Sequence, residues 1–408
     1  MNSNIARHIY PIALAHLVIE LCNNYLPVVY PLLITRMALS YAQVGLITLV
    51  GSAGGTLSQP LFGHLSDRFE ARQAIILSVL WIGLLMGLVG LSPGYGVLIA
   101  LVALGSLGSA AFHPAGATMA AAINTSRRGA TLSVFSVSGS LGSALSPLLI
   151  AAVITRVGLA GTMILFPIAL LAGLLLLRRW GRARGARNGM PASRAAMQPG
   201  TSSVPAQSGS LAGLVLVVFI VMCRSWFQMS LSTYLPEWLH SQGWPLTTSG
   251  QMLTVFLVSV SLGAVAGGTL SDHVGRWQVV ATSMALLSPA YFLFTGASGA
   301  PQMGLVAVTG ILLGSSFPVT VAMAQETWPQ GVGLASALVM GLGWLPGGLG
   351  ASFTGLVADR TSLATALSLL VIPPILGLAC ALAYGRHQRA TAPGHPPLPG
   401  SGLSTGEG

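Results

Sequence analysis

Long apolar stretches dominate this sequence and constrain its fold more than any other feature. A helix needs about 20 mostly apolar residues to cross a bilayer. Twelve stretches reach this length, at approximately 9–34, 42–64, 73–92, 95–122, 129–156, 158–178, 211–239, 247–271, 277–298, 301–325, 330–357 and 362–385. Only 6% of the residues are charged, against about 25% in a soluble domain, which excludes a water-soluble fold. The sequence therefore predicts an all-α integral membrane protein with twelve transmembrane helices.

The arginines predict how these helices are oriented. The chain has 18 basic residues, all of them Arg, and a net charge of +10. If both termini are cytoplasmic, fourteen arginines fall on the cytoplasmic side and three on the outer side, as the positive-inside rule requires. In a soluble protein this charge would suggest a nucleic-acid partner. Here it reports topology, and we expect a multi-pass protein with both termini in the cytoplasm and no nucleic-acid partner.

Two polar segments lie outside the expected transmembrane helices. Residues 180–210 are rich in Arg, Gly, Ser and Pro, which predicts a flexible cytoplasmic linker. Residues 386–408 have too few apolar side chains to pack a core and predict a disordered cytoplasmic tail. Residues 1–179 and 211–385 each contain six of the expected helices. We therefore expect two six-helix bundles joined by the linker.

The two halves share a repeated motif. The stretch GHLSDR that begins at Gly63 recurs as GTLSDH at Gly268, 205 residues later. Phe112-His113-Pro114 has a shorter counterpart, Phe317-Pro318. Two parallel six-helix repeats in one chain are a known transporter arrangement. The repeat predicts pseudo-symmetric bundles and favours an alternating-access transporter over a channel.

The repeated stretch falls in the short cytoplasmic loop after the second helix of each half. It resembles the signature of the major facilitator superfamily, Gly-x-x-x-Asp-Arg/Lys-x-Gly-Arg-Arg/Lys, although Glu70 and Ala71 depart from it. The matching residues are Gly63, Asp67, Arg68, Arg72, Gly268, Asp272, Gly275 and Arg276. The resemblance implies the major facilitator fold. It also implies a gating role, in which the Asp caps a helix or pairs with an Arg across the two halves.

Further stretches resemble one branch of that superfamily, the fosmidomycin-resistance type. Members of this branch are bacterial inner-membrane drug efflux proteins. They are HLVIE from His16, LP from Leu26, YPLL from Tyr30, FHP from Phe112, SVFSV from Ser133, RSW from Arg224, MAQE from Met323 and GLAS from Gly333. In that branch the acid four residues after the His is usually Asp, whereas this chain has Glu20. The resemblance implies proton-coupled antiport of a small anionic drug-like compound such as fosmidomycin across the inner membrane.

Charged side chains at bilayer depth cost at least about 2.5–3.5 kcal/mol each, so each needs a reason. The first apolar stretch places His16, Glu20, Asn23 and Asn24 on one face, and the seventh places Arg224, Gln228 and Ser232 on one face. Glu20 and Arg224 lie at similar depths near the midplane, and we expect them to pair when no substrate is bound. Glu20 is either the proton carrier or a structural partner of a polar helix. Arg224 binds a substrate anion or Glu20, or only holds helices together.

The other candidates have two interpretations each. His16 either titrates with Glu20 or acts as a hydrogen-bonded spacer, and His113 either lines the substrate site or accompanies the kink at Pro114. The candidates for substrate binding are Arg224, Asn23, Asn24, Gln228, His113, Trp226 and Trp344. The tryptophans equally fit packing against lipid or core. Glu237 and Asp359 fall at helix ends, where we expect them to be solvated.

Two other functions are alternatives to drug efflux. A proton symporter that imports a small carboxylate or sugar would use the same residues, and only the branch resemblance argues against it. An integral membrane enzyme would need a nucleophile–base or metal constellation at one membrane face, and the sequence pattern indicates none. We therefore expect a transporter rather than an enzyme, working as a monomer without a cofactor or bound metal. Its expected partners are a small-molecule substrate, protons and the bilayer.

Overall fold

The computed structural model describes residues 3–66, 70–124, 128–181, 209–342 and 344–391. Within these ranges the chain is helical and contains no strand. The N-terminal half contains α1 (Ser3–Asn23), α2 (Leu26–Met37), α3 (Tyr41–Leu57), α4 (Gln59–Ser66), α5 (Ala71–Leu88), α6 (Tyr95–Ala122), α7 (Arg128–Val157) and α8 (Leu165–Gly181). The C-terminal half contains α9 (Leu211–Ser241), α10 (Leu246–Val274), α11 (Arg276–Gly296), α12 (Gly299–Ser315), α13 (Phe317–Thr327), α14 (Val332–Leu342), α15 (Trp344–Arg360), α16 (Leu363–Ser368) and α17 (Ile372–Thr391).

Eleven helical stretches of the described chain are long and apolar enough to cross a membrane. They correspond to eleven of the twelve expected segments. The exception is the expected segment 42–64, which Ser58 divides into α3, of 17 residues, and α4, of 8 residues. The predicted all-α membrane fold is thus confirmed, and its second helix is broken rather than continuous.

Proline begins the second part of two other expected segments. Pro27 lies in the first turn of α2, and Pro318 lies in the first turn of α13. Proline is tolerated there because the first N–H groups of a helix have no intrahelical partner. Each of these expected segments therefore continues as a second helix.

Helix α17 corrects the predicted boundary of the tail. It continues to Thr391 instead of ending at 385, so residues 386–391 are helical. Gln388 donates to the Tyr384 hydroxyl over 3.1 Å, and the Arg389 guanidinium lies 5.3 Å from the ring centre of Trp277. The first contact lies within α17 and the second joins α17 to α11. Both stabilise the helix beyond its apolar stretch. The rest of the predicted tail, and residues 182–208 of the predicted linker, lie outside the described residues.

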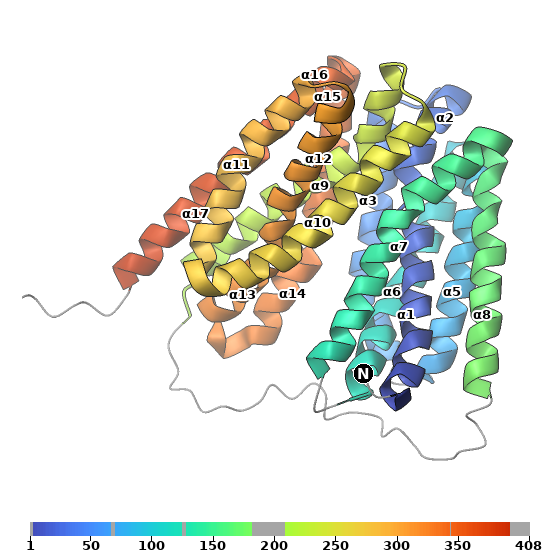
Figure 1. Cartoon of the computed structure of the whole chain (residues 1–408), viewed down its shortest axis with the longest axis horizontal. Helices are drawn as coiled ribbons and strands as arrows, with labels where there is room; N and C mark the ends of the chain where they lie inside the picture. Colours follow the sequence, from blue (N-terminus) through green and yellow to red (C-terminus); the bar gives the residue numbers. More distant parts are fainter. Residues whose placement is uncertain (1–2, 67–69, 125–127, 182–208, 343, 392–408) are drawn as a thin grey trace, which may run out of the picture.

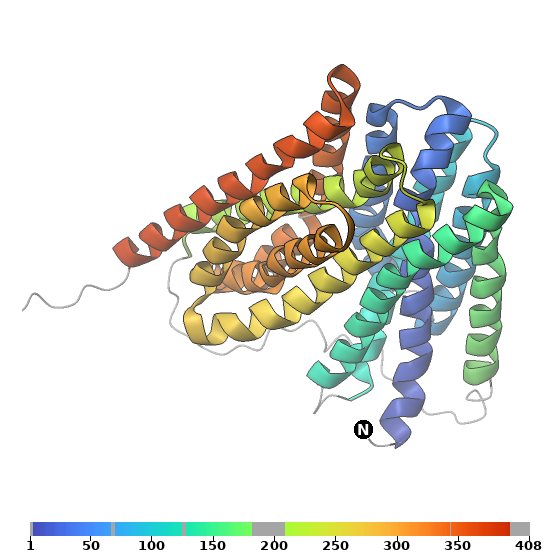
Figure 2. The same cartoon turned by 45° about the horizontal axis from the view of Figure 1, so that its top comes forward.

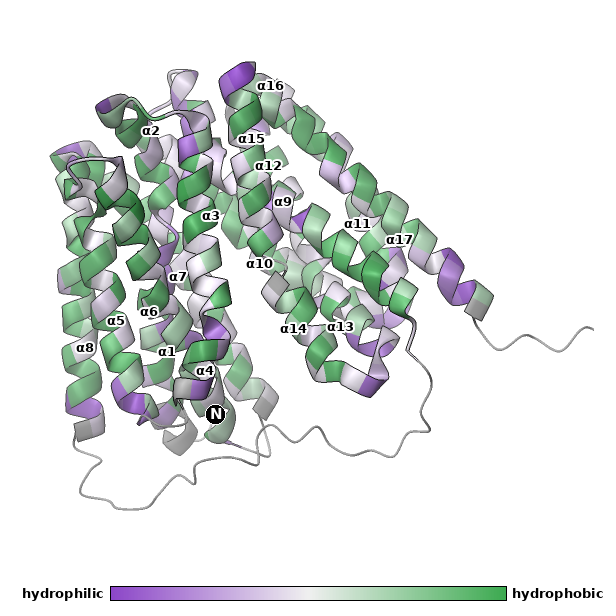
Figure 3. Ribbon diagram, turned by 180° about the vertical axis from the view of Figure 1, so that it is seen from behind, coloured by the Kyte–Doolittle hydropathy of each residue, from purple (hydrophilic) through white to green (hydrophobic). Residues whose placement is uncertain are grey.

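The described helices form two bundles, one from each half of the chain (Figure 1). In the N-terminal bundle α1 packs on α5, α6 and α7, and in the C-terminal bundle α9 packs on α15 and α17. Large apolar side chains are exposed on the outer faces, for example Leu171 of α8 and Phe292 of α11. Apolar residues cover most of the visible helices in Figure 3. Such a surface fits lipid, which replaces the water that a soluble protein would face.

The two bundles meet through α3 and α15, α7 and α10, and α2 and α9. We call the side where α8 ends and α9 begins the linker side, and the opposite side the far side. Hydrogen bonds between the described residues of the two halves form these pairs: Tyr41 with Asp359 and Tyr234, Ala42 with Asp359, Thr48 with Thr233, and Ala144 with Thr254. Most of these residues lie near the far-side ends of their helices. From there the bundles diverge toward the linker side (Figures 1 and 2).

Candidate functional site

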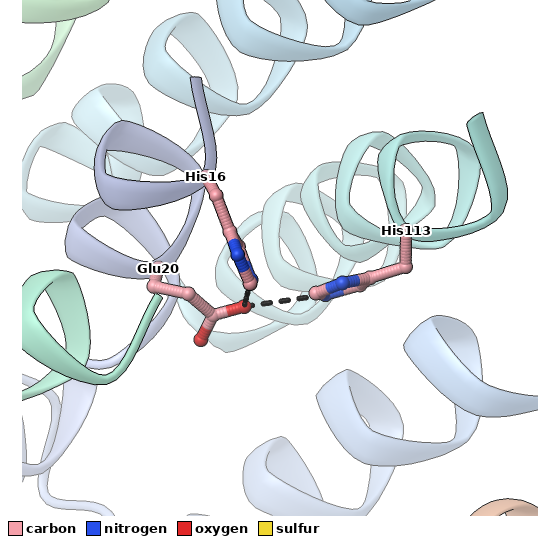
Figure 4. A group of neighbouring side chains, drawn as sticks. All are labelled: His16, Glu20 and His113. Atoms are coloured by element: carbon pink, nitrogen blue, oxygen red, sulfur yellow. Dashed lines mark ion pairs between the residues drawn. The ribbon is translucent and has the colours of Figure 1, made fainter. Parts of the chain in front are cut away.

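Three titratable side chains meet inside the N-terminal bundle. Glu20 and His16 project from α1, one helical turn apart, and His113 projects from α6 (Figure 4). Oε1 of Glu20 lies 3.2 Å from Nε2 of His113 and 3.8 Å from Nε2 of His16. We call these three residues the His–Glu cluster. In this geometry a proton can be held by the Glu20 carboxylate or by either of the two imidazoles beside it.

Neutral donors hold the other carboxylate oxygen of Glu20. Asn24 Nδ2 donates to Oε2 over 2.9 Å, and Ser143 Oγ of α7 donates to the same atom over 3.1 Å. Among the described residues, no Arg pairs with Glu20. The carboxylate is therefore oriented by dipoles and imidazoles, and no fixed positive charge ties it to one protonation state.

Small residues on α7 make this arrangement fit. Gly139 lies against the His16 ring and Gly142 against the backbone of Leu17, and a Cβ on either glycine would overlap these neighbours. One turn further, Ser146 donates to the Leu21 carbonyl over 2.5 Å. Small residues allow helices in membranes to approach closely. The close approach of α7 to α1 places Ser143 within reach of Glu20.

The same approach fixes the tautomer of His16. Its Nδ1 lies 2.7 Å from the Phe135 carbonyl of α7, and its ring stacks on the Phe135 ring with centres 4.0 Å apart. A carbonyl only accepts hydrogen bonds, so we assign the proton to Nδ1 from the hydrogen-bond network. In the neutral ring Nε2 then has no proton and faces Oε1 of Glu20. An attractive contact between these two atoms requires one added proton, carried by either group.

Arg224 lies apart from this cluster and has different partners. It is 5% exposed, its Nη2 donates to Oε1 of Gln228 over 2.8 Å, and its guanidinium lies 4.7 Å from the ring centre of Phe317. Its Nε has no hydrogen-bond partner. No acid pairs with it in the described part of the chain, so the expected Glu20–Arg224 pair is not formed in this structure. A buried cation with only neutral neighbours is left.

The tryptophans and Asn23 contribute less to this arrangement. Trp226 donates to the Thr354 hydroxyl over 3.1 Å and meets the Phe353 ring edge-on, so it packs within the C-terminal bundle. Trp344 is 40% exposed at the start of α15. Asn23 is half-buried at the end of α1. The contacts of Trp226 match its packing interpretation, whereas Asn24, His16 and His113 are brought together around Glu20.

Sequence and structure comparisons identify the family. The model of the Major Facilitator Superfamily matches residues 12–300 and 214–406. The chain belongs to the major facilitator superfamily. It is accordingly a multi-pass membrane transporter for a small molecule, and the fold expected from the motif in the second loop is confirmed.

Two relatives of this facilitator span nearly its whole length. The fosmidomycin resistance protein of Escherichia coli K12 is 29% identical over 371 residues, which cover 90% of each chain. The uncharacterized MFS-type transporter YfnC of Bacillus subtilis 168 is 27% identical over 380 residues, covering 91% of this chain and 92% of its own. The resemblance to the fosmidomycin-resistance type is thus confirmed.

A solved facilitator structure shows the same fold. It is that of a bacterial homologue of the human lysosomal transporter Spinster, in an inward-facing and occupied conformation. It superposes with a TM-score of 0.80 at 14% identity, covering 95% of this chain and 98% of that one. At this identity the likeness concerns the fold alone.

The facilitator signature is described mainly in its second copy. Asp67 and Arg68 of the first copy lie outside the described residues, while Gly63 lies in α4 and Arg72 lies in the first turn of α5. In the second copy Arg276 binds Asp272 at 2.7 Å and Glu326 of α13 at 3.1 Å. These ion pairs join α10, α11 and α13 within one bundle. This copy of the signature therefore does not form the expected pairing across the two halves.

The two far-side acids of this facilitator differ in exposure: Asp359 is exposed, as expected of a solvated helix end, whereas Glu237 is buried and corrects that expectation. Asp359, at the end of α15, accepts hydrogen bonds from the backbone N–H groups of Tyr41 and Ala42 at 2.7 and 2.9 Å, so it caps α3 of the other half. The Tyr234 hydroxyl lies 2.9 Å from the Tyr41 carbonyl beside it. Glu237 is only 8% exposed, and its Oε2 has no partner. No sequence signal links these residues across the two halves.

Proposed function

We propose that this facilitator exports a small anionic, drug-like compound such as fosmidomycin in exchange for protons. The observation that carries the proposal is the His–Glu cluster, a buried carboxylate surrounded by imidazoles and neutral donors at membrane depth. Ionisable groups inside a membrane are costly and typically serve transport. The similarity to the fosmidomycin resistance protein supports the substrate class.

The cluster suits a proton carrier because its two protonation states have different partners. With one added proton, Glu20 Oε1 and His16 Nε2 share that proton across their 3.8 Å contact, which shortens. Without it, the carboxylate accepts from His113 Nε2–H at 3.2 Å and from Asn24 and Ser143. The exchange requires no movement of charge other than the proton itself.

Arg224 suits a site for the substrate anion. A buried guanidinium is always charged, and burying a charge is costly unless it is paired. Gln228 and Phe317 are neutral, so a bound anion would supply the missing counter-charge. Its planar fork of donors matches a carboxylate or phosphate group. The acid and the cation thus lie on different halves, which the transport cycle moves relative to one another.

The direction of coupling follows from whether proton and substrate exclude one another. Antiport requires a substrate that contacts the Glu20 carboxylate and competes with its proton. The second candidate, a symporter importing a small carboxylate or sugar, is favoured by one observation: Arg224 binds no acid here, so an anion and a proton can occupy the two sites together.

Inside-out membrane vesicles distinguish these functions. Antiport predicts that an acid interior drives substrate into the vesicles, whereas symport predicts that an acid exterior does so. The variant E20Q keeps the shape and removes the titration, so proton-driven uptake should be lost while exchange of substrate across the membrane persists. Uptake by E20Q that still follows the imposed pH gradient would refute the carrier assignment.

We further place the protein in the bacterial inner membrane as a monomer, with both termini cytoplasmic and the substrate chemically unchanged. The distribution of arginines supports this topology. With that orientation the contacts between the halves lie on the outer side, and the bundles separate toward the cytoplasm. The conformation then corresponds to the state that loads substrate from inside the cell.

A further inference from the structure

We propose that the His–Glu cluster binds a divalent transition-metal ion, with Zn²⁺ the ion that its ligands suit. His16, Glu20 and His113 each offer one ligand atom, and these atoms all lie within 4.8 Å of one another. Imidazole nitrogen and carboxylate oxygen are common zinc ligands. Two histidines and one glutamate form the same ligand set as some catalytic zinc sites, although His113 of α6 follows Glu20 of α1 by 93 residues (113 − 20).

The distances match a tetrahedral ion. Zinc binds nitrogen and oxygen at about 2.0–2.2 Å, which places two tetrahedral ligands roughly 3.3 Å apart. The Glu20 oxygen lies 3.2 Å from the His113 nitrogen and 3.8 Å from the His16 nitrogen. An ion between the three atoms therefore needs the Glu20–His16 pair to approach by a few tenths of an ångström, and it draws together the two histidine nitrogens, which lie within 4.8 Å of each other.

The surrounding contacts orient the ligands as metal sites require. A metal-binding histidine usually donates its other N–H to a carbonyl or carboxylate. His16 does so, with Nδ1 on the Phe135 carbonyl at 2.7 Å, which leaves Nε2 free of a proton and directed at the site. Asn24 and Ser143 hold the second oxygen of Glu20, so the first is presented for binding. The metal would displace no structural hydrogen bond except that between His113 and Glu20.

The cluster is also accessible and selective. The His113 side chain is 30% exposed and that of Glu20 is 16% exposed, so an ion can reach them. Three protein ligands leave a fourth position for water, as in open zinc sites. Two imidazoles select transition metals over Mg²⁺ and Ca²⁺, which prefer oxygen ligands. The sequence placed His16 and Glu20 on one helix face, but it did not indicate that His113, which is distant in the chain, completes the set.

Metal binding would block proton exchange. The ion occupies Nε2 of both histidines and Oε1 of Glu20, which are the atoms that hold the proton in the transport cycle. Zn²⁺ and the carried proton therefore exclude one another, and Zn²⁺ acts as an inhibitor of transport. This consequence rests on the proposed function, whereas the binding itself does not.

Calorimetric titration of Zn²⁺ into the purified, tag-free full chain in detergent tests the site without any transport assay. We expect one Zn²⁺ per chain and no heat with Mg²⁺. H113Q, and the double variant H16Q/H113Q, should lose more than about 100-fold in affinity, because even outer contacts of metal sites are worth roughly 10- to 100-fold. The control H240Q removes an exposed histidine outside the cluster, whose ring is hydrogen-bonded to the Trp244 carbonyl, and should bind as the wild type does.

H113Q changes a partly exposed side chain and should remain folded, which thermal unfolding checks. If the wild type takes up no Zn²⁺, or H113Q and the double variant bind it as tightly as the wild type, the metal site is refuted. Zn²⁺ should also inhibit pH-driven uptake into vesicles by the wild type. Binding at the cluster with uptake unaffected would refute the block and leave the site standing. Binding with no pH-driven uptake at all would count against the proposed function alone.

Discussion

Glu20 of α1 and Arg224 of α9, charged side chains within the bundles, are held in opposite ways. Glu20 is surrounded by groups that gain or lose a proton with it, His16 and His113, so its charge can change. Arg224 is surrounded by an amide and a phenyl ring, so its charge is constant and lacks a counter-ion. A residue that carries protons must be able to change its charge, whereas one that attracts an anion must not. The environments of these two residues therefore match the separate roles proposed for them.

Loss of the Arg224 charge should weaken substrate binding. We expect R224Q to raise the Kd of an anionic substrate by about 10- to 100-fold, the equivalent of a charge-assisted hydrogen bond worth roughly 1.5–3 kcal/mol. Binding to the purified protein measures the change. The control R156Q removes the same charge from an exposed position at the end of α7. Equal effects of both substitutions would show that general charge, and not this site, attracts the substrate.

The Glu20 and Arg224 positions were both identified from the sequence, together with neighbours on the same helix, but their partners on other helices were not. An isolated charge in an apolar stretch is visible in a linear pattern because it interrupts the stretch. The pairing of Glu20 with His113 is not visible, because α6 reaches α1 only in the folded bundle. Phe317, the neighbour of Arg224, was missed for the same reason: a phenylalanine in an apolar helix carries no signal.

Among the helices, α7 has the most specific construction. Its glycines and serines at 139, 142, 143 and 146 all face α1. Small residues of this kind allow close helix packing. The structure adds that the same stripe supplies two hydrogen bonds to α1 and positions the Phe135 carbonyl behind His16.

A methyl group on this stripe should separate the two helices. The Cβ of G142A would overlap the Leu17 backbone, which cannot move as a flexible side chain can. Overpacking of this kind typically costs about 1–3 kcal/mol, so thermal unfolding in detergent should occur at a lower temperature and proton-driven uptake should fall. G304A is the matched control, because a Cβ at this position in α12 meets open space. A G142A protein as stable and active as G304A would contradict the close approach.

At the scale of the whole molecule, the two halves are joined on the far side and apart on the linker side. Asp359 bridges α15 to the start of α3, and Thr48 faces Thr233 at 3.2 Å between their hydroxyl oxygens. Alternating access requires these contacts to break when the far side opens. The halves also pack closely through small residues, since Gly45 lies against Ala351 and Gly250 against Ala151, and this packing must separate and re-form as well.

A covalent link at this interface should stop the cycle. In a background with Cys22, Cys223 and Cys380 replaced by Ala, the pair T48C/T233C should form a disulfide on oxidation, since the hydroxyls already touch. Transport should be lost when the pair is oxidised and recover on reduction. The single variants T48C and T233C should be insensitive to oxidant. Full transport by the cross-linked protein would mean that the halves need not separate at this point.

The sequence by itself determined that this is a twelve-segment membrane protein of the major facilitator type, built from two related halves, with charges at two places inside the membrane. These properties are local: apolar length, arginine distribution and repeated motifs can be read along the chain. Only the tertiary structure decided that Glu20 joins His16 and His113 rather than Arg224, that Asp359 caps a helix of the other half, and that Arg276 binds within its own bundle. Each of these contacts joins different helices, and the packing of small residues between helices selects among the partners that the sequence leaves open.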